Sequence, residues 1–240
     1  MKIPRRIRWS HIRRFYEVLE PYLKALPRKL QHPDSGRVLV LAPHIDDDII
    51  GAGGVIRKHT QQGDEVAAVY LADCTPERMQ EGKEAAGIMG YRRTEFFEYR
   101  AKTLLEHREI PERLSALIAD INPDIVYLPS LFDRHNDHLA VNHHLAGLFS
   151  RYRYAFTVYA YEVWTTLIPN VVVDISDTID KKKEALACHR SQMSSHNWLE
   201  AAVCLNRYRA VVSGAGEYAE GFMRYSMKEY FTLWKKMYGK

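Results

Sequence analysis

The sequence predicts an α/β protein of the Rossmann-like kind, with a mostly parallel sheet and helices on both of its faces. Short apolar runs rich in β-branched residues alternate with longer segments that have helical spacing. Such alternation produces parallel strands that are joined by right-handed crossovers. The chain has 240 residues, of which 46% are hydrophobic, so it can bury the core of one large domain.

The expected elements follow one another without an internal repeat. The first strand covers residues 37–42, and the next helix runs from about Val55 to Gln62, where Gly63 ends it. Further strands are expected at 66–71, 94–99, 124–128, 155–161 and 171–174, and further helices at 77–89, 110–121 and 139–149. The apolar residues of 227–238 also have helical spacing, which predicts a C-terminal helix docked on the core.

Residues 1–36 are predicted to form a basic helical arm, separate from a single domain at 37–240. Apolar side chains recur every three or four residues from Trp9 to Tyr22, and Pro27 and Pro33 end this pattern. The arm holds nine lysines and arginines against three acids, a net charge of +6, which leaves −2 for the rest. We interpret the arm as a solvated amphipathic helix; peripheral contact with an anionic membrane surface is the alternative.

Several classes of protein are excluded. No apolar run approaches the roughly 18 to 20 residues that span a bilayer, and the basic start is not followed by the apolar stretch of a secretory signal, so we expect a soluble cytoplasmic protein. The three cysteines have no CxxC spacing, which argues against a disulfide framework and against a cysteine-based zinc site. Any metal would have to be held by histidines and carboxylates.

Two polar loops follow predicted central strands. Residues 43–48 read PHIDDD after the first strand, and residues 133–138 read DRHNDH after the strand at 124–128. Three consecutive carboxylates repel one another unless a cation or a helix N-terminus compensates for them. The carboxyl ends of parallel strands meet where the strand order reverses, so the fold should bring the two loops together. Two histidines and one aspartate are a common catalytic zinc set, whereas His143 and His144 are interpreted as helix-flank residues.

These motifs carry a resemblance to a known family. PHIDDD resembles the PHPDDE signature of the LmbE-like, or PIG-L, zinc-dependent N-deacetylases, and HNDH at 135–138 resembles their HPDH signature. The resemblance runs from about residue 37 to about residue 225 and implies an LmbE-like fold. It also includes NPDIV at 122–126, HRSQ at 189–192 and YAEGF at 218–222.

The resemblance also implies a metal centre and a reaction. His44, Asp47 and His138 would be the metal ligands, and Asp46 the general base that activates a water molecule. His135 would stabilise the oxyanion of the tetrahedral intermediate or protonate the departing amine. The metal would be Zn²⁺, with Fe²⁺ as an alternative because such ligands accept both.

The substrate implied by the resemblance is an N-acetylated amino sugar, of the N-acetylglucosamine type, or its conjugate. Arg78 and Asp48 are the candidate substrate-binding residues. Ile45 and Asn136 replace the usual prolines of the two signatures and leave the ligands intact. Asp48 is one methylene shorter than the usual glutamate, which puts its hydrogen bond in question.

Other functions stay open at this point. A metal-dependent hydrolase could act on a different N-acyl or ester bond, since substrate choice depends on the surrounding loops. A nucleotide- or nucleic-acid-binding module is suggested by the glycines of 51–54 and by the basic arm, but these glycines match neither GxGxxG nor a P-loop, so we expect no nucleic-acid partner. The C-terminal helix leaves a homo-oligomer open.

Overall fold

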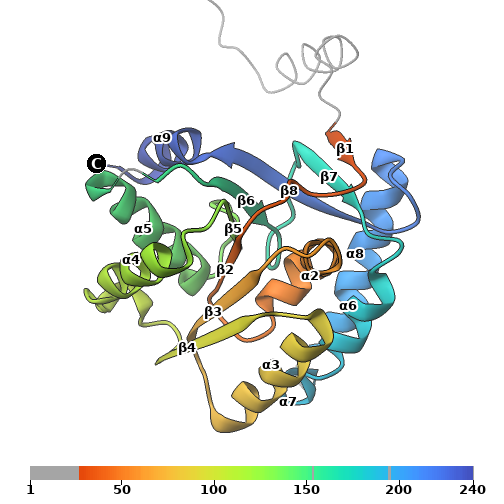
Figure 1. The fold of residues 1–240 in the computed structure, drawn as a ribbon, viewed down its shortest axis with the longest axis horizontal. Helices are drawn as coiled ribbons and strands as arrows, with labels where there is room; N and C mark the ends of the chain where they lie inside the picture. The colour runs from red at the N-terminus through yellow and green to blue at the C-terminus, as the bar shows by residue number, and fades with distance from the viewer. Residues whose placement is uncertain (1–26, 153, 194–195, 240) are drawn as a thin grey trace, which may run out of the picture.

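The computed structural model describes residues 27–152, 154–193 and 196–239, which form an eight-stranded mixed sheet. The strand order is β1-β7-β8-β6-β5-β2-β3-β4 (Figure 1). Strand β8 pairs antiparallel with β6 and β7, and the other neighbours are parallel. The strands are β1 (Arg28–Leu30), β2 (Val38–Ala42), β3 (Val66–Ala72), β4 (Arg93–Tyr99), β5 (Ile125–Pro129), β6 (Thr157–Tyr161), β7 (Val171–Asp174) and β8 (Ala219–Ser226).

Helices cover both faces of the sheet, as the sequence predicts (Figure 1). One face carries α2 (Asp47–Gln61), α3 (Pro76–Met89), α6 (Ile179–Leu186) and α8 (Trp198–Ser213), with the short α7 (Arg190–Met193) beside α3. The other face carries α4 (Ile110–Ile121), α5 (Asn136–Arg151) and α9 (Met227–Tyr238), with a 3-10 turn at Leu104–Glu106.

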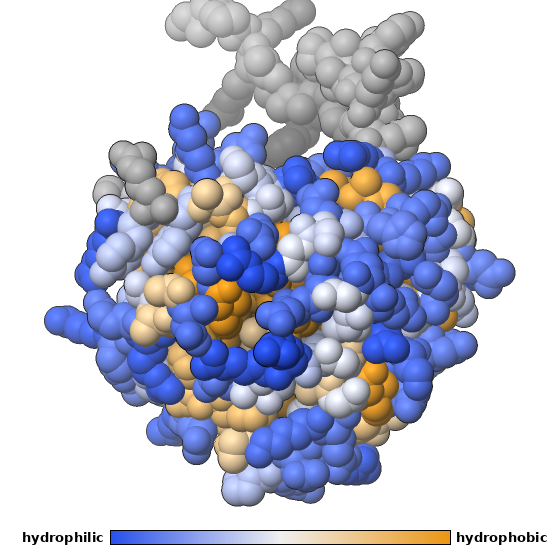
Figure 2. Space-filling model, in the orientation of Figure 1, coloured by the Kyte–Doolittle hydropathy of each residue, from blue (hydrophilic) through white to orange (hydrophobic). Residues whose placement is uncertain are grey.

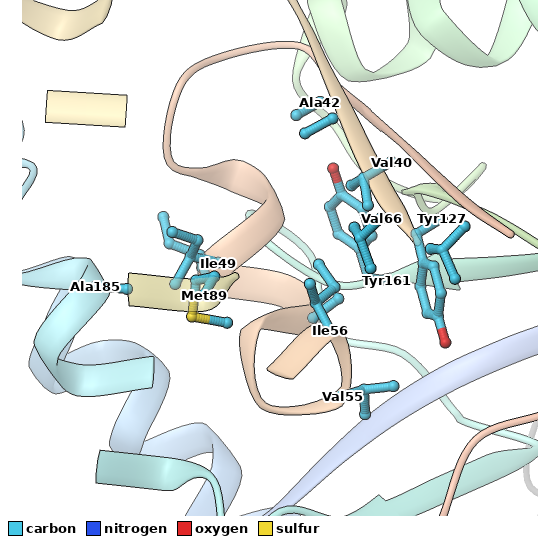
Figure 3. Close-up of a cluster of buried hydrophobic side chains, with 14 of the residues drawn as sticks. Val40, Ala42, Ile49, Val55, Ile56, Val66, Met89, Tyr127, Tyr161 and Ala185 are labelled. Carbon is cyan, nitrogen blue, oxygen red and sulfur yellow. The ribbon is translucent and has the colours of Figure 1, made fainter. Parts of the chain in front are cut away.

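The central strand β2 shows how the two layers are built. All five of its residues are buried, and alternate side chains enter opposite cores. Val38 and Val40 pack with α2, α3 and α6, whereas Leu39 and Leu41 pack with α4 and α5. Figure 3 shows the first of these cores, where side chains of β2 and α2 gather. Strand β2 lies between β3 and β5, so the strand order reverses between β2 and β5.

Helix α2 begins at Asp47, eight residues before the predicted start at Val55. The prediction was wrong because the glycines of 51–54 were interpreted as a turn, whereas they lie inside the helix and allow it to pack closely. A Cβ on Gly51 would meet Cδ2 of Tyr161 at 2.3 Å, and one on Gly54 would meet Ile175 at 2.7 Å. The close approach places the acidic run at the start of the helix, against β6.

A buried ion pair fixes the middle of α2. Glu220 of β8 accepts hydrogen bonds from the backbone N–H groups of Gly54 and Val55, both at 2.8 Å, and pairs with Lys182 of α6 at 2.7 Å. Lys182 in turn donates to the carbonyl of Ile50 at 2.8 Å. These contacts tie the backbone of α2 to the sheet and to α6, so the helix is held in place below the loops that follow β2 and β5.

The remaining predictions have mixed outcomes. The strands and helices expected between residues 66 and 174 are present, with ends that shift by up to three residues. Strand β8 and helices α6 and α8 were not predicted, and Arg28–Leu30, assigned to the arm, pairs with β7 as part of the sheet. The helix expected near residues 9–22 lies outside the described residues.

The face in Figure 2 is mostly hydrophilic, and its hydrophobic areas are small. None of the helices in the described part of the chain combines the length and the apolar character needed to cross a membrane.

Candidate active site

The loops after β2 and β5 meet at the carboxyl edge of the sheet. Oδ2 of Asp47 lies 3.1 Å from Nδ1 of His44 and 3.2 Å from Nε2 of His138. Asp47 is 2% exposed and His138 is fully buried. Both rings therefore converge on one carboxylate oxygen, which is the spacing that neighbouring ligands of a metal ion adopt. The structure brings together all three residues that the sequence predicted as ligands.

A second layer of carboxylates lies behind the two histidines. Nε2 of His44 is 3.0 Å from Oδ2 of Asp137, and Nδ1 of His138 is 3.2 Å from Oδ2 of Asp133. Asp137 is fixed in turn by the backbone N–H of Lys102, at 2.8 Å. Carboxylates that contact the outer nitrogen of a histidine are typical of metal sites, because they orient the ring and increase its basicity.

The electrostatics of this cluster favour a cation. Burial opposes protonation of His44, but the charge of Asp47 and the contact with Asp137 outweigh it and raise its pKa to about 10. The same balance, with Asp47 and Asp133, raises the pKa of His138 to about 9. Burial would raise the pKa of Asp47, but the charges of the two histidines hold it well below its usual value. The carboxylates thus create a strongly negative site.

The fit to a metal ion rests on the donor atoms themselves. Among the described residues, neither ring nitrogen of His138 has a hydrogen-bond partner, although the ring is fully buried. Ring nitrogens of His44, His135 and His138 lie within 4.8 Å of one another. Both nitrogens of His138 lie 3.2 Å from a carboxylate oxygen without a hydrogen bond of good geometry, and such donors suit a divalent cation, so these residues could hold a metal.

Asp46 precedes the first turn of α2 and differs from its neighbours. Among the described residues, its buried carboxylate makes no hydrogen bond or ion pair. Burial, and then the charge of Asp47, raises its pKa well above the usual value. An unengaged carboxyl with a raised pKa beside a metal site is suited to accept and return a proton.

His135 caps the N-terminus of α5 and lies at the same edge. Its ring centroid is 4.9 Å from those of His44 and His138. Nδ1 of His135 accepts a hydrogen bond from the backbone N–H of Asp137 at 3.3 Å. Burial and the charges of the neighbouring histidines lower its pKa. The ring is therefore favoured in its neutral form with the proton on Nε2, the nitrogen that remains free to donate.

The two predicted substrate-binding residues are placed differently. Arg78, in the first turn of α3, forms an ion pair with Asp73 and keeps a quarter of its side chain exposed, so it can reach solvent near the site. Asp48 is fully buried, and its Oδ2 accepts hydrogen bonds from Tyr70 at 3.0 Å and from Tyr91 at 2.7 Å. This burial does not agree with a substrate contact; Asp48 instead ties α2 to β3 and to the segment before β4.

The other two histidines of α5 have partners in the structure, and two further carboxylates belong to the site. His143 accepts from Trp234, and His144 contacts the carbonyl of Leu104, so both have structural partners as expected. Asp133 and Asp137 received no role from the sequence, although Asp137 lies inside the HNDH motif and Asp133 two residues before it. Both acidic residues lie within five positions of His138, a predicted ligand, and this short spacing could have identified them.

The family described as "PIG-L: GlcNAc-PI de-N-acetylase" matches residues 39–147, a segment that contains both polar loops. Over this segment the chain is similar to the PIG-L family. The match and the mostly parallel sheet confirm the resemblance and the fold class that the sequence predicted.

Two curated relatives and one solved structure extend the likeness. A diacetylchitobiose deacetylase of Thermococcus kodakarensis is 27% identical, over 77% of this chain and 81% of that protein. A probable N-acetyl-alpha-D-glucosaminyl L-malate deacetylase of Bacillus cereus is 29% identical, over 65% of this chain and 83% of that protein. The conserved protein TT1542 of Thermus thermophilus is 28% identical and superposes with a TM-score of 0.68, over 78% of this chain and 94% of that one.

Proposed function

We propose that this chain, which is similar to the PIG-L family, is a metal-dependent hydrolase that removes the acetyl group from an N-acetylated amino sugar or its conjugate. The convergence of His44 and His138 on Oδ2 of Asp47, with a carboxylate behind each ring, carries the proposal. The names of the relatives support it, since both are deacetylases of N-acetylglucosamine-type compounds.

The ligands we propose are Nδ1 of His44, Oδ2 of Asp47 and Nε2 of His138. Asp137 and Asp133 would hold the two rings in place from behind. Nitrogen and oxygen ligands of this kind accept Zn²⁺, and Fe²⁺ is the alternative. When bound, such an ion polarises a carbonyl group and increases the acidity of water.

Asp46 is the proposed general base. Its carboxylate adjoins Asp47 and is free of other partners among the described residues, so it can take a proton from the attacking water. The water oxygen bonds to the amide carbon, and the bond from that carbon to nitrogen breaks. Asp46 then returns its proton to the nitrogen, which leaves as the free amine of the sugar together with acetate.

His135 is proposed to stabilise the negative charge on the carbonyl oxygen. Because Nδ1 accepts the hydrogen bond from the N–H of Asp137, the proton of the neutral ring is on Nε2. That N–H can donate to the oxygen as the tetrahedral intermediate forms. Arg78 would hold a hydroxyl group or an anionic group of the substrate, since Asp73 fixes its guanidinium close to Asp46.

The test is an assay for acetate release across a panel of N-acetylated sugars, with other N-acyl compounds and simple esters included. We expect activity on N-acetylated amino sugars, its loss with a chelator, and its loss in Asp46→Asn. Preference for an ester or for a different N-acyl group would instead favour the broader hydrolase. A protein inactive on every compound, although loaded with zinc, would contradict the proposal. Residues 1–26 lie outside the described part, and contact of the basic arm with an anionic membrane surface stays the alternative to a solvated helix.

A further inference from the structure

Beside the candidate active site lies a row of aromatic rings for which the proposed reaction gives no role. The indole of Trp164 stacks against His135, with ring centroids 5.8 Å apart and planes at 21°. Trp198 meets Trp164 edge-on at 4.9 Å, and His196 meets it at 5.8 Å. The row therefore continues from the metal-site histidines toward the surface, one ring after another.

Trp164 is 48% exposed, although burial of an indole would contribute more to folding stability than burial of most other side chains. Its loop is not free to fold the ring inward. Buried Glu162 pairs with Arg209 at 2.6 Å and accepts the N–H of Leu167 at 2.8 Å, and Arg209 also donates to the carbonyl of Leu167 at 2.7 Å. These bonds close the loop at its base and keep the indole at the surface.

One carboxylate fixes the indole relative to the site. Asp133 contacts Nδ1 of His138 at 3.2 Å. It also accepts hydrogen bonds from the backbone N–H of His135 at 3.0 Å and from the backbone N–H of Trp164 at 3.1 Å. Asp133 thus holds the backbones of His135 and Trp164 and also the ring of His138, a proposed metal ligand. The face of Trp164 keeps a set distance from the reacting centre, which is what a substrate subsite requires.

We propose that Trp164, backed by Trp198 and His196, binds a second pyranose ring of the substrate, next to the acetylated sugar. This inference rests on the proposed function and names its substrate class as a disaccharide or longer saccharide. The apolar C–H face of a pyranose stacks on an indole, and its hydroxyls need polar partners around it. Such partners adjoin the rings: His196 and Asn197 are exposed, as is Thr166.

The test compares two probes, the methyl glycoside of N-acetylglucosamine and N,N′-diacetylchitobiose. For Trp164→Ala we expect kcat/KM on the disaccharide to fall about ten-fold or more, and kcat/KM on the monosaccharide to stay unchanged. Trp164→Phe keeps an aromatic face and should retain most of the disaccharide activity. Tyr152→Ala is the matched control, because Tyr152 is 49% exposed at the far end of α5.

An equal loss on both probes would overturn the subsite, since Trp164 would then act through His135 alone. Equal losses in Trp164→Phe and Trp164→Ala would overturn it as well. Calorimetric binding of the disaccharide to Asp46→Asn, with and without Trp164→Ala, gives a readout that does not depend on turnover. If the wild-type protein releases no acetate from either probe, the proposed function fails, and a ten-fold weaker binding on removal of the indole would still support the subsite.

Discussion

Nε2 of His138 lies 3.2 Å from Oδ2 of Asp47, although Asp47 begins α2 and His138 lies in the first turn of α5. Among the described residues neither nitrogen of this buried ring has a hydrogen-bond partner. The contact is therefore a close approach of two candidate ligands, and it depends on the reversal of strand order between β2 and β5.

The carboxylate behind His44 provides the first prediction. Asp137→Asn keeps the size of the side chain but weakens its hold on the ring, so the affinity for zinc should fall by about 10- to 100-fold. Asp64→Asn is the matched control, because Asp64 holds Nδ1 of His59 at 2.7 Å outside the site. Competition with a zinc-binding dye measures both. An affinity of Asp137→Asn equal to that of the control would contradict the role of Asp137.

Asp46→Asn separates binding from catalysis. The substitution removes a carboxylate without partners, so zinc binding and thermal stability should stay near those of the wild type. The rate of acetate release should fall by about 10²- to 10⁴-fold, as expected for the loss of a general base. Steady-state kinetics and metal analysis on the same samples check both statements. Full activity in the variant would exclude Asp46 as the base.

Two glycines of helices form a matched pair for stability. Gly51→Ala should lower the free energy of unfolding by about 1 to 3 kcal/mol, because the new Cβ overlaps Tyr161. Gly87→Ala meets no atom within 4 Å and should raise it by about 0.5 to 1 kcal/mol, since alanine favours the helix. Denaturant unfolding measures both changes. Equal shifts would show that α2 does not pack against β6 as closely as described.

His189 predicts a pH dependence of stability. The ring is 1% exposed, has no hydrogen-bond partner among the described residues, and burial lowers its pKa from 6.5 to about 4. In the unfolded chain His189 therefore binds a proton below about pH 6.5, whereas in the folded protein it binds one only below about pH 4. Stability contributed by the neutral ring is present above pH 6.5 and is lost as the pH falls, by up to about 1.4 kcal/mol per pH unit.

The comparison for that prediction is His189→Leu, which cannot titrate. As the pH falls from 7.5 to 5, the free energy of unfolding of the wild type should fall relative to that of the variant, by up to about 1.4 kcal/mol per pH unit below pH 6.5. Parallel curves over this range would show that the protonation of His189 is not linked to folding.

The sequence predicted that the two polar loops come together, and it missed the start of the helix that follows the first of them. The chemistry of PHIDDD and HNDH, together with their positions after apolar strands, is local and can be seen in the printed residues. The start of α2 was missed because glycine normally disfavours a helix interior, and only the partner residue Tyr161 explains why Gly51 is needed.

The rest depends on contacts between distant segments. Glu220 stands in a sequence motif, but its bonds to α2 and to Lys182 follow from the antiparallel strand β8, which has no strong alternation of its own. Asp48 was assigned to the substrate through the resemblance, at the position of the family's usual glutamate, whereas in the structure it accepts hydrogen bonds from Tyr70 and Tyr91. Trp164 acquires its place beside His135 through its backbone bond to Asp133 and through the bonds of Glu162 to Arg209 that close its loop, contacts between segments far apart in the sequence.

In our proposal, a metal ion held by His44, Asp47 and His138 makes this chain a deacetylase. The most direct measurement is acetate release from an N-acetylglucosaminide during titration of metal-free protein with zinc, in the wild type and in His138→Ala. We predict that the wild-type rate rises linearly, reaches a plateau at about one zinc per chain, and returns to baseline with a chelator, while the folded variant stays inactive. Full activity of the metal-free protein, or of His138→Ala, would contradict the account.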